Sequence, residues 1–186
     1  MKWQCLLWVT LFSTLNLSAW STYSEAAGPW KAQIVDAETK QPLEGVVVLA
    51  WWTRHVRGFP GGPSSEYHDS EEVLTDKDGR FTIAARSFFS LNPLVFFRGP
   101  EFTIFRPGYG RWDQYGRYPM TGGTKGRYEH DLLSQDDIVV DLPRLQSLAA
   151  RKEYIGGPLS PVMPLEKMPL LQKAIREERR AIGYRN

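Results

Sequence analysis

The run Gly45-Val-Val-Val-Leu-Ala-Trp-Trp52 decides the fold that we expect of this chain. A β-branched and aromatic stretch of about seven residues that follows a glycine is typical of a β-strand. Because side chains alternate along a strand, one face would carry Val46, Val48, Ala50 and Trp52, and the other Val47, Leu49 and Trp51. Both faces are apolar. One face is expected to meet an opposing sheet, and the other needs a further cover.

Segments on both sides of this run extend it into a β-domain. Residues 30–37 predict a strand that ends in a polar turn at Pro42. Asp76-Lys-Asp-Gly79 predicts a hairpin turn that joins strands at 72–75 and 80–84. Further strands are predicted at residues 94–98, 102–106 and 137–142, whereas the Gly-rich segments 53–70 and 110–126 predict long loops. The expected architecture is all-β and antiparallel.

The composition excludes some classes of function. The chain has 186 residues, a hydrophobic content of 42% and a formal net charge of +2. A nucleic-acid binder would concentrate Lys and Arg in a stripe, so no nucleic-acid partner is expected. The single cysteine, Cys5, lies in the N-terminal segment. The mature chain is therefore expected to use neither a disulfide nor a thiol nucleophile.

Residues 1–26 have the pattern of a secretory signal peptide. Lys2 precedes eighteen residues without a charge, and Ser24-Glu-Ala26 places small side chains at positions −3 and −1 of a cleavage after Ala26. We therefore expect export to the periplasm or the extracellular space, with no stable transmembrane segment after cleavage. The alternative is a retained membrane anchor, because the uncharged run reaches the lower length limit for spanning.

Three segments, in this order, resemble the carboxypeptidase regulatory-like family, which has a transthyretin-like fold. They are Val35-Asp-Ala-Glu-Thr-Lys-Gln-Pro-Leu-Glu-Gly-Val-Val-Val48, Thr75-Asp-Lys-Asp-Gly-Arg-Phe-Thr-Ile83 and Phe105-Arg-Pro-Gly-Tyr109. The resemblance implies a seven-stranded antiparallel, transthyretin-like or Ig-like β-sandwich over residues 29–143. It implies a fold rather than an activity, because this family is a scaffold for many functions.

Residues 144–186 are expected to form a Pro-rich and helical tail. Helices are predicted at 145–154 and 169–182, and the second has a thin apolar stripe made of Leu171, Ala174, Ile175 and Ile182. Because the central strand is apolar on both faces, we expect this tail to fold back on the outside of one sheet. The alternatives are a tail that binds a membrane surface or a partner, with a second copy or another protein covering the sheet.

No catalytic or metal-binding arrangement is visible in the sequence, and no catalytic residue, cofactor or metal is expected. His55, His68 and His130 lie more than ten positions apart, without a His or Cys partner at metal-ligand spacing. The Tyr184-Arg185-Asn186 end matches only two residues of the Tyr-Arg-Gly-Ser strand of hydroxyisourate hydrolases, and the His-x-His pair of intradiol dioxygenases is absent. An enzyme on such a sandwich, a small-molecule hydrolase or an iron dioxygenase, stays the alternative, because a catalytic triad assembles in space.

One set of aromatic and basic residues is the candidate binding surface, since aromatic side chains and Arg are common anchors of interfaces. It comprises Trp51, Trp52, Arg54, His55 and Arg57 on one side, and Tyr109, Arg111, Trp112, Tyr115, Arg117 and Tyr118 on the other. The alternative is that the Trp pair belongs to the core and that the Tyr-Arg loop covers a sheet end. The expected function is a non-catalytic binding or assembly module of the cell envelope, with an envelope protein, a peptide or a glycan as partner.

Overall fold

The computed structural model describes residues 27–58, 64–110, 138–156 and 163–184, together with residues 133, 134 and 136. This part of the chain is mostly sheet and has two short α-helices, as the expected all-β class requires. Its elements are β1 (Trp30–Asp36), β2 (Val47–Val56), β3 (Ser64–Leu74), β4 (Arg80–Ile83), β5 (Val95–Phe105), β6 (Val139–Leu142), α2 (Leu148–Gly156), the 3-10 helix η1 (Leu165–Lys167) and α3 (Pro169–Ala181).

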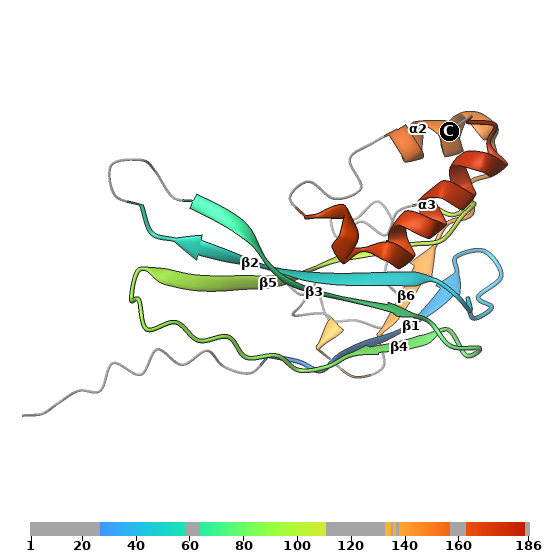
Figure 1. Cartoon of the computed structure of the whole chain (residues 1–186). Coiled ribbons are helices and arrows are strands. Elements are labelled where there is room, and N and C mark those ends of the chain that lie inside the picture. Colours follow the sequence, from blue (N-terminus) through green and yellow to red (C-terminus); the bar gives the residue numbers. More distant parts are fainter. Residues whose placement is uncertain are drawn as a thin grey trace, which may run out of the picture.

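The six described strands form two three-stranded sheets, with strand orders β4-β1-β6 and β3-β2-β5. The longer sheet, β3-β2-β5, lies between the shorter sheet and the helices (Figure 1). Of the four strand pairs in these sheets, three are antiparallel. The fourth, between β1 and β6, is parallel, so the expectation of a purely antiparallel fold is wrong.

The main hydrophobic core lies between the two sheets. Trp30 of β1 packs against Trp52 of β2, with 5.7 Å between ring centroids, and against Phe102 of β5 at 6.4 Å. Val48 and Ala50 of β2 belong to the same buried cluster, as do Ile83 of β4 and Val140 of β6. The face of β2 that carries Trp52 is therefore the inner face, and Val48, Ala50 and Trp52 share it as the alternation predicts.

The prediction of a long loop at residues 53–70 is wrong. Strand β2 continues to Val56, and β3 begins at Ser64 and pairs antiparallel with it, with a register shift between Trp52 and Thr53. Residues 64–70 are polar and resemble a loop in composition. They form a strand nevertheless, because pairing with β2 satisfies their backbone groups without an apolar side-chain pattern.

The two strands predicted on either side of Gly99 and Pro100 form one strand, β5, so this division is also wrong. The pairing of β5 with β2 shifts register between Trp51 and Thr53, opposite this pair. Gly99 has a φ of +115°, and a Cβ atom there would lie 2.8 Å from the carbonyl oxygen of Trp51. The glycine thus lets the two backbones approach closely, and the strand continues through the irregularity.

The tight turn predicted at Asp76-Lys-Asp-Gly79 is confirmed, but the hairpin around it is wrong. Gly79 has a φ of +72°, and its N–H donates to the Asp76 carbonyl at 2.9 Å. The strands on either side belong to different sheets, since β3 pairs with β2 and β4 pairs with β1. The Gly79 carbonyl accepts the N–H of Ile34 at 2.7 Å, which ties the turn to β1. The turn therefore connects the two sheets.

The C-terminal segment folds back on the outside of the longer sheet, as predicted. A second buried cluster joins Val47, Leu49 and Trp51 of β2 and Phe105 of β5 to the helices and the residues that flank them, which contribute Ile155, Met168, Leu171, Ala174, Ile175 and Ile182. Figure 1 shows α3 running over one half of this sheet. Helix α3 begins at Pro169 and is followed by Gly183 with a φ of +84°, in agreement with the predicted bounds.

Two carboxylates fix the position of α3. Glu72 of β3 accepts the free N–H groups of Leu170 and Leu171 at 2.8 Å each, which satisfies the first turn of the helix. Glu178, which is buried, accepts two hydrogen bonds from the Arg151 guanidinium at 2.7 and 2.6 Å and one from the Gly108 N–H at 2.8 Å. These bonds connect α3 to α2 and to the turn after β5.

Candidate functional site

The structure separates the two halves of the candidate binding surface. Val47 pairs with Phe105 at one end of β2, and Val56 pairs with Val95 at the other. Tyr109 follows the first end and Arg57 follows the second. The two ends are about 30 Å apart, from nine residues at about 3.3 Å each. Arg111, Trp112, Tyr115, Arg117 and Tyr118 lie outside the described residues, as do His130 and the cleavage position Ala26.

The Trp pair belongs to the core, as the alternative interpretation holds. Trp52 is 3% exposed and packs between the sheets, whereas Trp51 is 9% exposed and packs in the cluster under the helices. The assignment of these two residues to an exposed surface is therefore corrected. The two-residue period of a strand places adjacent large side chains on opposite faces, and here both faces are covered.

Tyr109 is buried too, and its surroundings indicate a structural role. Its hydroxyl donates to Asp36 Oδ2 at 3.0 Å, and the guanidiniums of Arg106 and Arg144 lie 5.3 and 5.5 Å from its ring centroid. Burial disfavours the Asp36 carboxylate, but hydrogen bonds from the Thr39 N–H, the Tyr109 hydroxyl and the Glu38 N–H, with the charge of Arg144, lower its pKa to about 2. This node ties β1 to the chain after β5.

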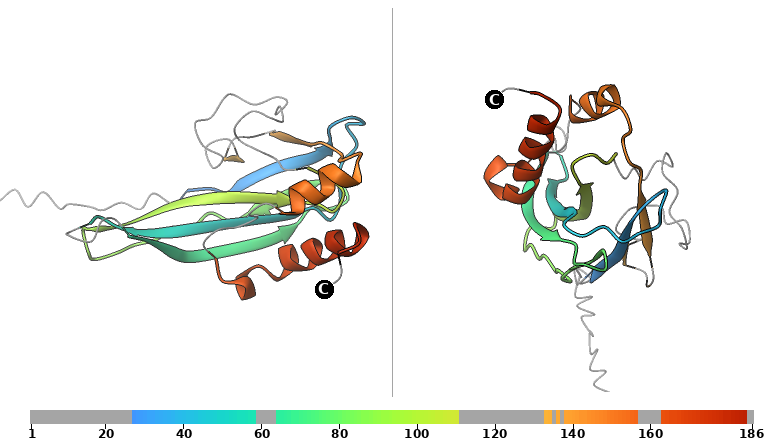
Figure 2. Two further views of the ribbon diagram at one scale, coloured as in Figure 1. Left: turned by 90° about the horizontal axis from the view of Figure 1, so that it is seen from above. Right: turned by 90° about the vertical axis from the view of Figure 1, so that its right-hand side faces the viewer.

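The remaining described members of the surface, Arg54, His55 and Arg57, lie at the end of the longer sheet that the helices do not reach. The left view in Figure 2 agrees with Figure 1 and shows β2, β3 and β5 extending past α2 and α3. We define the outer face as the face of this sheet turned away from β4-β1-β6. The covered end is the part of this sheet that lies under the helices. The uncovered end is the part of this sheet formed by residues 53–57, 64–67 and 95–98.

An aromatic and basic cluster occupies the outer face of the uncovered end. His55 pairs directly with Phe96 of β5, and their rings stack with 5.1 Å between centroids and an interplanar angle of 18°. The guanidinium carbons of Arg57 and Arg98 lie 5.4 and 5.2 Å from the centroid of the same Phe96 ring. We call these four residues the Phe96 cluster. Arg54 alternates to the other face and forms an ion pair with Glu66 at 2.6 Å.

The protein environment favours the neutral form of His55. Partial burial lowers its pKa below 6.5, the positive charge of Arg98 lowers it further, and the negative charge of Glu101 acts in the opposite direction. The ring also forms a hydrogen bond of 2.8 Å between Nε2 and the Thr53 hydroxyl. At neutral pH, His55 therefore serves as a flat, uncharged partner of Phe96, and the positive charge of the cluster comes from its arginines.

The inner side of the uncovered end is filled by aromatic side chains that support the strands. Phe88 packs against Trp52, His68 and Phe97 with centroid distances of 5.7, 4.6 and 5.4 Å. Arg86 lies over Trp52 and bridges Asp69 and Glu71 at 2.6 and 2.9 Å. The segment after β4 that supplies Phe88 also presents exposed apolar side chains, namely Phe89, Leu91 and Leu94. The uncovered end is thus ordered, with apolar groups at its margin.

Sequence reasoning missed Phe96, Arg98 and the exposed leucines. The sequence places Phe96 and Phe97 in a strand, but nothing in the local pattern shows which of them meets His55. The cross-strand register decides this, and it depends on the irregularity at Gly99. The available signal was the arginine at position 98, the last residue of a predicted strand, together with Arg57 in the predicted loop after the central strand.

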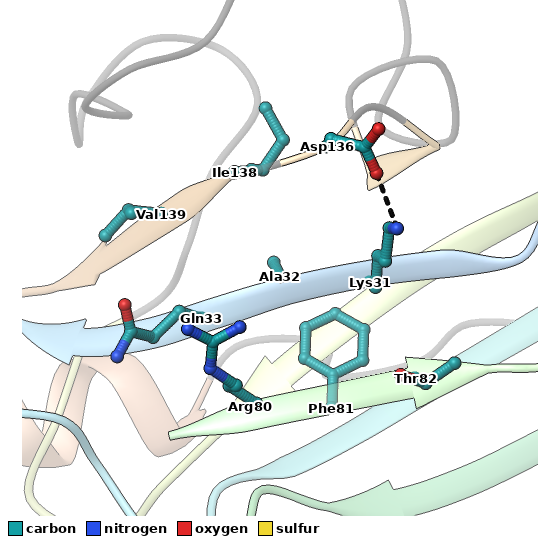
Figure 3. A pocket seen from close by; sticks show the side chains of 9 residues that line it. All are labelled: Lys31, Ala32, Gln33, Arg80, Phe81, Thr82, Asp136, Ile138 and Val139. Atoms are coloured by element: carbon teal, nitrogen blue, oxygen red, sulfur yellow. Dashed lines mark ion pairs between the residues drawn. The ribbon is translucent and has the colours of Figure 1, made fainter. Parts of the chain in front are cut away.

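A pocket of about 420 Å³ lies elsewhere, lined by residues of β1 and β4 and by the chain at the start of β6 (Figure 3). Lys31 lines it and is paired with Asp136 at 2.5 Å, and the Gln33 amide donates to the Asp78 carbonyl at 2.9 Å. Two of its polar groups are therefore engaged by the protein itself. Within the described residues, no group of three or more His, Cys, Asp or Glu side chains is arranged to hold a metal ion.

Comparisons with protein-family models, with curated proteins and with solved structures find no match to this chain. In the described part of the chain, no helix has the length and apolar character needed to cross a membrane.

Proposed function

We propose that this protein is a non-catalytic binding or assembly module that is exported to the cell envelope, and that it holds its partner at the uncovered end of the longer sheet. The observation that carries this proposal is the Phe96 cluster, in which two arginines and a histidine surround one partly exposed aromatic ring. Arginines and aromatic side chains on a rigid support are the usual anchors of protein interfaces.

Exposed apolar groups beside the cluster support the same proposal. Leu91 is 90% exposed and Leu94 is 46% exposed. Leu94 lies next to the cluster, because its carbonyl accepts the N–H of Arg57 at 2.8 Å. An apolar margin next to a basic and aromatic centre gives a partner both contact area and specific polar bonds.

The fold that we propose is a transthyretin-like sandwich of the kind found in the carboxypeptidase regulatory-like family. Two features support it, namely the two sheets and the buried cluster that contains side chains from both of them. The proposal requires a seventh strand beyond the six that the described residues form. Backbone hydrogen exchange over residues 111–137 tests it, since a further strand would protect a block of amides there.

Export rests on the signal-peptide pattern of residues 1–26, and mass spectrometry of the protein from its native cell tests it. A mature chain that begins near Ala27 in the periplasm or the medium is expected. A soluble cytoplasmic species with an intact Met1 contradicts export.

Site-specific photo-crosslinking in the native cell tests the binding function. A photoreactive residue replaces Leu94 at the uncovered end, and a matched variant carries the same residue at Leu148, which is exposed on α2. Adducts of defined mass are expected at position 94 and not at position 148. Adducts at both positions or at neither contradict a partner site at this end.

Metal analysis of the purified protein tests the alternative that the protein is an enzyme. Stoichiometric iron or zinc would overturn a non-catalytic role.

A further inference from the structure

We propose that the partner presents an acidic segment, and that Arg57 and Arg98 together bind one of its carboxylates beside the Phe96 ring. This inference rests on the proposed binding function of the uncovered end and specifies the chemistry of the partner. The bound segment is a stretch of protein chain in which Asp or Glu is flanked by apolar side chains.

The two arginines converge on one point of the outer face. Phe96 and Arg98 are two residues apart on β5, and Arg57 is two residues beyond His55, the cross-strand neighbour of Phe96. Side chains at such spacing share a face of the sheet. Both guanidinium carbons lie within 5.4 Å of the same ring centroid. A carboxylate that binds beside this ring is therefore near both guanidiniums, each of which matches a carboxylate in geometry.

Neither of these guanidiniums forms an ion pair within the described part of the chain. Some arginines elsewhere in that part do have carboxylate partners. Arg54 pairs with Glu66, Arg144 with Asp36 and Arg151 with Glu178. Glu101 is near enough to influence His55 electrostatically, yet it forms no ion pair with Arg98. The charge of the cluster is thus left for a group from outside.

The distribution of charge favours a discrete carboxylate over a membrane surface. Attraction to an anionic bilayer requires a local excess of basic residues. The outer face of the uncovered end carries Arg57 and Arg98, with Glu101 near them, and these two arginines are fewer than the roughly four to eight basic residues of a typical membrane-binding cluster. Such a surface selects a partner with one or two well-placed acidic groups.

Selection from a random peptide library tests the proposal with a probe that assumes no particular partner. The probe is a phage-displayed library of linear peptides, panned on the full chain lacking residues 1–26. We expect the selected peptides to be enriched in Asp or Glu next to Leu or Phe. Their affinity for an Arg57→Gln/Arg98→Gln variant should fall by about tenfold or more, since two charge-assisted bonds are lost.

The matched control is an Arg54→Gln/Arg80→Gln variant, which loses the same charge. Arg54 is on the opposite face of the sheet, and Arg80 belongs to the other sheet. The control should bind the selected peptides as the unmodified protein does. Thermal midpoints of both double variants that equal the midpoint of the unmodified protein establish that the substitutions leave the fold intact.

The possible results separate the partner class from the function itself. Selected peptides without acidic residues, or with equal affinity for both double variants, overturn the carboxylate site while a binding function at another place survives. Failure to select any peptide counts against both proposals. Co-sedimentation with phosphatidylglycerol vesicles provides a second arm. Binding to vesicles that is lost only in Arg57→Gln/Arg98→Gln overturns the acidic segment in favour of a lipid surface.

Discussion

The covered and the uncovered end of the longer sheet are built from the same three strands, yet their outer faces differ in composition. At the covered end, the outer face carries Val47, Leu49 and Trp51 of β2 and Phe105 of β5, all buried under the helices. At the uncovered end, the outward side chains are Thr53, His55, Phe96 and Arg98, and the last of these is exposed. The change occurs between Trp51 and Thr53, next to the last residues that the tail covers.

This difference shows that the outer face of the longer sheet is apolar where the C-terminal helices pack on it, and mixed aromatic and basic where they do not. An apolar outer face that met water would be a site of association, so the tail and the apolar part of β2 depend on each other. A mixed aromatic and basic face can remain open. Substitutions or truncations at one end of the sheet should therefore change stability or association in ways that matched substitutions at the other end do not.

The largest effect is expected when the cover is removed. Truncation after Gln146 deletes α2 and α3 but keeps Arg144, so the Asp36 node stays intact. Met168, Leu171 and Ile175 are lost from the second cluster, and each buried side chain of this kind contributes on the order of 1.5 to 3 kcal/mol. The thermal midpoint should fall strongly, and size-exclusion chromatography should show association. A monomeric fragment with an unchanged midpoint would show that the tail is not needed as a cover.

Two phenylalanines on the same face of β5 should respond differently to truncation to alanine. Phe105 is 0% exposed and lies under the helices, so Phe105→Ala should cost about 3 to 5 kcal/mol of unfolding free energy. Phe96 is partly exposed at the uncovered end, so Phe96→Ala should cost about 1 to 2 kcal/mol. Urea denaturation of both variants measures the difference. Equal losses would mean that the uncovered end is as tightly packed as the covered one.

Acid should destabilise the protein through Asp36 of β1, which the Tyr109 hydroxyl and Arg144 contact. Its pKa is about 2 in the folded protein and 3.8 in the unfolded chain, so folding is favoured above pH 3.8 and this contribution is lost as the pH falls towards 2. The loss amounts to about 2 kcal/mol. An Asp36→Asn variant should lack this part of the pH dependence, and Asp78→Asn, at an exposed position, should retain it. Denaturation series between pH 2 and 5 compare the three proteins.

The smallest effect concerns the charges of the uncovered end. The pKa of His55 should lie below 6.5, because partial burial and the Arg98 charge disfavour the imidazolium. Arg98→Gln should raise this pKa, whereas Glu101→Gln should lower it further. Titration of the imidazole signals by nuclear magnetic resonance measures both shifts. An unchanged His55 pKa in Arg98→Gln would place Arg98 away from the ring and would weaken the assigned cluster.

Features that depend on local chemistry could be predicted from the sequence. Gly79 adopts the positive φ that its turn requires, and α3 begins at a proline and stops before a glycine. The apolar stripe of α3 and the two apolar faces of β2 also led to the correct packing of the tail, because each surface needed a partner. These predictions follow from the chemistry of single segments and from the need of each apolar surface for a partner that covers it.

Strand pairing could not be predicted in the same way. Whether the chain after Gly79 pairs with β3 or crosses to β1 depends on contacts between distant segments, and the turn itself permits both. The parallel pairing of β6 with β1 is a further case, since the segments lie more than a hundred residues apart. The site was affected most by this limit, because the contact of His55 with Phe96 and the separation of Tyr109 from Arg57 both follow from strand register.

The position of α3 along the chain has a consequence for biosynthesis. The six described strands leave the ribosome before α3, and the bonds of Glu178 to Arg151 and to the Gly108 N–H form only when this helix has been made. Until then, the part of the apolar outer face of β2 that packs against α3 lacks this cover. A nascent or partly translocated chain is therefore most prone to aggregation just before α3 arrives, and a chaperone that binds apolar strands would be needed in that interval.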